Sequence, residues 1–148
     1  MRAASRSVLL VFLVLLGCAA SALAEAPPAP PYRVIVHPRN APRSLSRRFV
    51  GEALLKKTTR WPDGRVIRPV DLPLDSPVRR RFSDDVLNRS VEAVRAYWQH
   101  VVFSGRDVPP PQLASDAEVV KYVATHEGAV GYVSGSASVE GARVVGVE

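Results

Sequence analysis

The sequence has little of the chemistry on which disulfide-stabilised proteins and metalloproteins depend. Only one of its 148 residues, Cys18, is a cysteine, so the chain cannot form an intrachain disulfide. The three histidines, His37, His100 and His126, lie too far apart for any local metal-binding motif. We therefore expect no metal site and no cofactor.

Recognisable catalytic motifs are also missing. The sequence contains no G-x-S-x-G, no H-E-x-x-H and no G-x-x-x-x-G-K phosphate loop. Its adjacent acids Asp84 and Asp85 would point in different directions from a helix, which makes them a poor acid/base pair. We expect no catalytic residues and no enzymatic activity.

No run of five or six like charges is present, so nothing resembles a nucleic-acid-binding arm. The formal net charge is +6, and the basic residues are spread along the chain. Such an excess favours anionic partners without specifying one. We expect no nucleic-acid partner.

The first 24 residues have the order of a secretory signal peptide. Two arginines precede an apolar run at 8–16, and small residues follow up to Ala22 and Ala24, which fit an A-x-A cleavage site. The run is too short to span a bilayer as a stable anchor. We therefore expect a signal peptide at 1–24 and a periplasmic or otherwise exported protein.

Cys18 leaves an alternative open, because "LLGC" is similar to the lipobox of bacterial lipoproteins. Leu16 is large for the position two residues before the cysteine, which favours simple cleavage. The second interpretation is a lipid anchor at Cys18, and it is the only route to a membrane that the sequence offers.

The remainder divides into a stiff proline-rich spacer at 25–31 and one domain at 32–148. Strands are expected at 32–37, 65–72, 129–133 and 142–147, the second at an edge because of its proline. Helices are expected after the N-caps Ser44 or Ser46, Ser76, Ser90 and Ser115. This order predicts an α/β fold with a single small mixed sheet flanked by helices.

Four segments in order resemble the phosphate ABC transporter substrate-binding protein family. They are "VIVHPRNAPRSLSRRFVGE", "RWPDG", "RRRFSDDVL" and "HEGAVGYV". The resemblance implies a periplasmic-binding-protein-like fold. Full-size members of that family have two lobes that close on an oxyanion, and this chain is similar to one lobe only. Where the family has an Arg and then Ser-Gly-Thr at the phosphate, this sequence has Leu72 and then Ser76, Pro77 and Val78.

The stretch "LPLDSPVRRRF" contains the candidate ligand site. Arg80 and Arg81 have acids four residues later, whereas Arg79 has none on its own helix. We therefore predict that the site for phosphate or a related oxyanion consists of Ser76, Val78, Arg79 and Asp75. The alternative is that Ser76 only caps the helix and Arg79 pairs with Asp75.

Two functions follow from these observations. The first is an exported, non-catalytic solute-binding-like module that takes a small inorganic anion, weakly or with the help of a partner. The second is a protein-interaction or dimerisation domain of the cell envelope that has lost anion binding. Of the two tryptophans, Trp98 is expected in the core, whereas the role of Trp61 stays open.

Overall fold

The computed structural model describes residues 28–40 and 43–148. The expected signal peptide, the expected lipidation site and the first part of the expected spacer lie outside these residues. Within the described part, no helix has both the length and the apolar character needed to cross a membrane.

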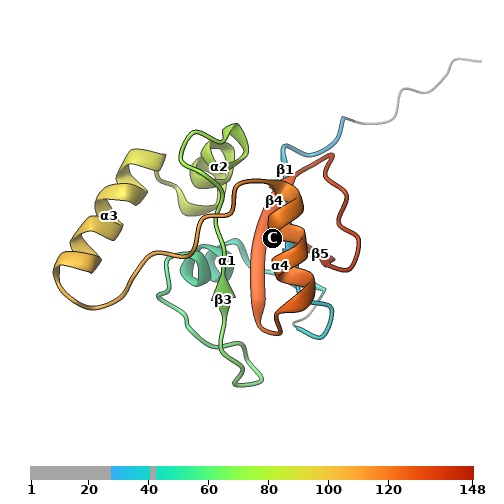
Figure 1. The fold of residues 1–148 in the computed structure, drawn as a ribbon, viewed down its shortest axis with the longest axis horizontal. Helices are drawn as coiled ribbons and strands as arrows, with labels where there is room; N and C mark the ends of the chain where they lie inside the picture. Colours follow the sequence, from blue (N-terminus) through green and yellow to red (C-terminus); the bar gives the residue numbers. More distant parts are fainter. Residues whose placement is uncertain (1–27, 41–42) are drawn as a thin grey trace, which may run out of the picture.

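Five strands, four α-helices and one π-helical turn make up the described part of the fold (Figure 1). The strands are β1 (Tyr32–Val36), β2 (Ser44–Leu45), β3 (Arg68–Pro69), β4 (Ala129–Ser134) and β5 (Arg143–Val147). The helices are α1 (Arg47–Leu54), α2 (Pro77–Phe82) with the π-helical η1 (Ser83–Leu87) directly after it, α3 (Val91–Phe103) and α4 (Asp116–Thr125).

All five strands form one mixed sheet in the order β2-β5-β1-β4-β3. The first strand, β1, lies in the centre and pairs antiparallel with both β4 and β5. The outer pairs, β3 with β4 and β2 with β5, are parallel. The carboxyl ends of β3 and β4 therefore lie at the same edge of the sheet.

Helices cover both faces of this sheet, and two neighbouring residues of β4 show how. A Cβ placed on Gly131 would lie 2.9 Å from a methyl group of Val119, on α4. The ring of Tyr132 stacks on Phe82, at the end of α2, with centroids 3.8 Å apart. Because successive strand side chains point to opposite faces, α4 covers one face and α2 the other.

Helix α3 packs mainly outside this core. Its buried residues Val94, Trp98 and Val101 form a small separate cluster with Leu55. Figure 1 shows α3 beside α2 and well away from the sheet. One flank of α3 is consequently available to line a surface pocket.

The expected α/β fold with one mixed sheet and flanking helices is confirmed. Ser46, Ser76, Ser90 and Ser115 all cap helices through side-chain oxygens that accept a backbone N–H. The strand expected at 65–72 is shorter than predicted, since only Arg68–Pro69 forms a strand, flanked by isolated bridges at Val66 and Asp71, although it does lie at the edge.

The close approach of α4 to β4 generates a first prediction. Gly131→Ala places a methyl group 2.9 Å from both Val119 and Val70, which is closer than packed atoms tolerate. We expect a loss of about 1–3 kcal/mol in the free energy of unfolding, measured by urea denaturation. Gly146→Ala on β5 is the matched control, because its new methyl group meets nothing nearer than 3.6 Å. Equal losses in the two variants would contradict this account of the packing.

Candidate functional site

The N-termini of α2 and α4 meet beyond the carboxyl ends of β3 and β4. Asp116, the first residue of α4, holds the start of that helix at the end of β4: its carboxylate accepts hydrogen bonds from the Ser134 hydroxyl at 2.5 Å and from the Ser134 N–H at 3.2 Å. A pocket of about 340 Å³ lies between the two helix starts. We call it the α2/α4 pocket; it is lined by Leu72, Pro73, Asp75, Ser76, Pro77, Val78, Ala114, Ser115 and Asp116.

Most donors in the first turn of α2 are already used or absent. The Ser76 hydroxyl oxygen accepts the N–H of Arg79 at 3.2 Å, and Pro77 has no N–H to offer. The N–H of Val78 forms no hydrogen bond with any residue that the structure describes. This N–H and the rotatable Ser76 O–H are therefore the donors that α2 presents to the pocket.

The charges around the α2/α4 pocket are negative. Asp75 and Asp116 line it, and no lysine, arginine or histidine is among its described lining residues. The positive ends of two helix dipoles therefore face a concavity whose ionised side chains are carboxylates. Such a surface attracts an anion only weakly on its own.

Arg79 does not contribute its charge to this pocket. Its side chain is only 3% exposed, and its guanidinium forms an ion pair with Asp71, Nη2 to Oδ2, at 2.9 Å. The other terminal nitrogen, Nη1, donates to the Leu72 carbonyl at 2.6 Å. The expectation that Arg79 lacks a neutralising carboxylate is wrong, and its partner is Asp71 rather than Asp75.

Asp71 is itself held by several donors. Its Oδ1 accepts the N–H of Leu72 at 2.9 Å and the hydroxyl of Tyr132. Burial raises the pKa of the Asp71 carboxyl, and the nearby Arg79 guanidinium opposes that rise. Burial, and then the Asp71 charge, also raise the pKa of Tyr132, so its hydroxyl keeps the proton that it donates.

The structure thus brings together three of the four predicted site residues. Asp75, Ser76 and Val78 line the α2/α4 pocket, whereas the Arg79 side chain lies elsewhere. That these residues bind an anion stays a prediction. Among the other arginines, Arg81 pairs with Asp85 at 3.0 Å as expected, whereas the ion pair expected between Arg80 and Asp84 does not form.

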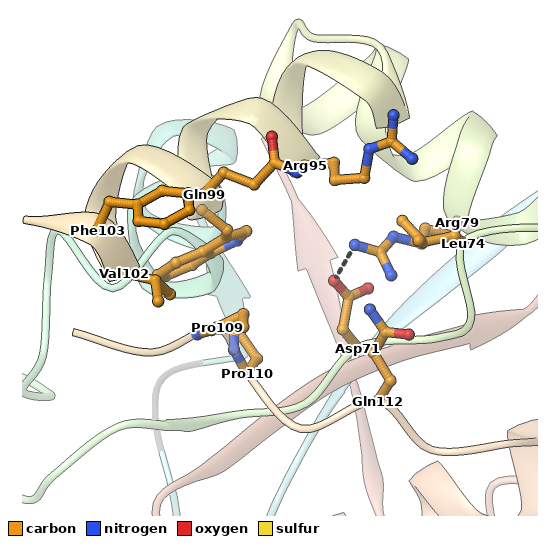
Figure 2. A pocket seen from close by; sticks show the side chains of 11 residues that line it. Asp71, Leu74, Arg79, Arg95, Gln99, Val102, Phe103, Pro109, Pro110 and Gln112 are labelled. Atoms are coloured by element: carbon orange, nitrogen blue, oxygen red, sulfur yellow. Dashed lines mark ion pairs between the residues drawn. The ribbon is translucent and has the colours of Figure 1, made fainter.

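A second pocket, the α3 pocket, contains the Arg79–Asp71 ion pair and was not foreseen from the sequence (Figure 2). It has a volume of about 350 Å³. Its lining residues are Asp71, Leu74, Arg79, Arg95, Trp98, Gln99, Val102, Phe103, Pro109, Pro110 and Gln112. The one sequence signal for it is Asp71, a lone acid in the apolar stretch "PVDL".

Both tryptophans are buried in the protein. Trp98 is buried, as expected, although its edge reaches the α3 pocket. Trp61 is buried as well, and its indole N–H donates to the Gly128 carbonyl at 2.9 Å. No group of three or more potential metal ligands occurs among residues 28–40 and 43–148.

Several solved structures of phosphate-transport proteins have a similar fold. The chain superposes on an ABC-type phosphate transport receptor from Vibrio cholerae with a TM-score of 0.61 and 17% identity, covering 78% of this chain and 45% of that one. A putative phosphate ABC transporter substrate-binding protein with bound phosphate, from Clostridium perfringens, superposes with a TM-score of 0.59 and 20% identity, covering 78% of this chain and 44% of that one. PstS from Borrelia burgdorferi superposes with a TM-score of 0.61 and 14% identity, covering 79% of this chain and 47% of that one.

These likenesses establish the fold, and the chain spans less than half the length of each of these proteins. No protein-family model matches the sequence, and a search of curated proteins finds no match either. The fold is that of one lobe of a periplasmic binding protein.

The buried ion pair generates a second prediction. Asp71→Asn or Arg79→Met leaves an uncompensated buried charge, and each should lower the free energy of unfolding by about 3–5 kcal/mol. The double variant leaves no charge, while the new side-chain amide still offers an oxygen to the Tyr132 hydroxyl. We expect the double variant to recover most of the loss in urea denaturation. A double variant as unstable as the sum of the two single variants would show that the pair is not coupled.

Proposed function

We propose that the protein is an exported, non-catalytic solute-binding-like module that binds phosphate or a related oxyanion at the α2/α4 pocket, with the opposing wall supplied by a partner. The observation that carries this proposal is the meeting of two helix N-termini outside the carboxyl ends of β3 and β4. In open α/β sheets this is where ligands bind, and helix N-termini favour anions. The phosphate-related names of the proteins with the same fold support the choice of ligand.

The α2 end offers a small set of donors to such an anion. The Ser76 hydroxyl accepts its capping bond through oxygen and can donate its proton at the same time. The Val78 N–H adds a second donor. An oxyanion that takes both would lie between Asp75 and Asp116, both of which repel it.

The proposal includes a partner because the few donors of the pocket are opposed by two carboxylates. With no cation among the described lining residues and only one wall, the pocket leaves much of a small anion in water. A second surface that closes over the pocket would exclude water and strengthen each donor–anion bond. The chain aligns with less than half of each of the phosphate-transport proteins, so the match covers only part of their length.

A second function has its own supporting observation. Arg79, the residue expected to hold the anion, is neutralised by Asp71 inside the protein. The same face would then act as a protein-interaction or dimerisation surface in the cell envelope that no longer binds anions. Both proposed functions include export of the protein, by cleavage after Ala24 or by lipidation at Cys18.

A titration of the exported chain with phosphate and with sulfate, followed by NMR of the backbone amides, tests the first function. We expect millimolar phosphate to shift the Val78 amide. Ser76→Ala should weaken binding, because it removes a donor. Asp75→Asn should strengthen binding about threefold, because it removes a like charge from the pocket. Arg79 is unsuitable for this test, since replacing it also removes the buried pair.

Ser90→Ala is the control for Ser76→Ala, because Ser90 caps α3 in the same way, with its oxygen 3.1 Å from the Ala93 nitrogen, and lines neither of the two pockets. Both variants lose a cap, but only Ser76→Ala should change the titration. An unshifted Val78 amide at millimolar phosphate, together with dimers in light scattering, would favour the interaction domain instead.

A further inference from the structure

The α3 pocket has two chemically different sides. Figure 2 shows Phe103 and Val102, from the end of α3, on one side, and the Asp71–Arg79 pair with Gln112 on the other. Its volume of about 350 Å³ lies at the lower end of the range for small-molecule sites. A ligand that fits both sides must itself be amphipathic.

Three of the apolar side chains that line the pocket are open to water. Phe103 is 90% exposed, Val102 46% and Leu74 40%. These are three of the six large hydrophobic side chains exposed in the part of the chain that the structure describes. Exposed apolar groups that gather in this way often mark binding surfaces.

The polar side selects the sign of the ligand's charge. Both oxygens of Asp71 are taken, by Arg79 on one and by Leu72 and Tyr132 on the other, so the carboxylate has little left for a cation. The ion pair is neutral as a whole. The remaining ionised side chain is Arg95, which is exposed and forms no hydrogen bond or ion pair with a described residue.

Two amides complete the polar side. The side chains of Gln99 and Gln112 are exposed and, like Arg95, make no hydrogen bond within the described residues. Each can donate to a carboxylate or accept from a hydroxyl. Their position at the pocket leaves donors available to a ligand without breaking any bond inside the protein.

We propose that the α3 pocket binds a small organic acid: a carboxylate on an aromatic or branched aliphatic body. The carboxylate pairs with Arg95 and takes hydrogen bonds from the glutamine amides. The body packs against Trp98, Val102 and Phe103. Inorganic phosphate lacks the body and is not the ligand of this pocket.

This inference does not rest on the oxyanion function. The α3 pocket and the α2/α4 pocket have no lining residue in common. Loss of phosphate binding by Ser76→Ala therefore leaves the α3 pocket intact, and the tests of the two proposals can fail separately.

The test uses 3-phenylpropionate as the probe on the exported chain, with its neutral amide and acetate beside it. Binding is followed by NMR at the Trp98 indole N–H and at the side-chain amides of Gln99 and Gln112. We expect the acid to shift these signals at lower concentration than its amide, and acetate and phosphate to leave them unchanged. Arg95→Gln should weaken binding of the acid about threefold to tenfold and leave the amide unaffected.

Phe103→Ala should weaken binding of the acid and of its amide alike, by about threefold to tenfold, because both probes bury their ring against Phe103. Both replaced side chains are exposed, so the fold is expected to survive. The matched controls are Arg60→Gln and Val144→Ala, exposed residues that do not line the pocket. Unshifted signals at millimolar acid would overturn the proposal, as would an amide that binds as tightly as the acid.

Discussion

A buried guanidinium is stable in this fold because a carboxylate is buried beside it. Arg79 comes from α2 and Asp71 from the segment after β3, while Tyr132 comes from β4 and donates to the same carboxylate. The group therefore joins a helix, an edge strand and an inner strand through one set of charge-assisted bonds. Removing either charge leaves the other buried without its counter-charge, so the two charged residues persist as a unit.

This internal use of Arg79 determines what the surface can offer. The concavity between the starts of α2 and α4 has two helix N-termini but no positive side chain among its described lining residues. The two carboxylates, Asp75 and Asp116, are therefore the only ionised side chains among its described lining residues. The same ion pair, which is neutral as a whole, also lines the amphipathic α3 pocket.

Local signals predicted the fold well, and long-range pairing explains where they failed. Capping serines and alternating apolar residues located the helices and strands, because both act within a few residues. The expectation that Arg79 is available to an anion was wrong, and so was its alternative, a pair with Asp75. The actual partner, Asp71, reaches Arg79 only because the chain turns back after β3. No local pattern could place Tyr132 against Asp71, or α3 opposite both, since those contacts depend on tertiary packing.

The central position of β1 also has a consequence for the time at which the protein can fold. Tyr32 pairs with Ser134 and Val36 with Arg143, so β1 cannot form its strand pairs before β4 and β5 have been synthesised. Closing such large loops costs entropy before the strand pairs repay it, which slows folding. A chain of this topology cannot complete its sheet until β4 and β5 have both been made.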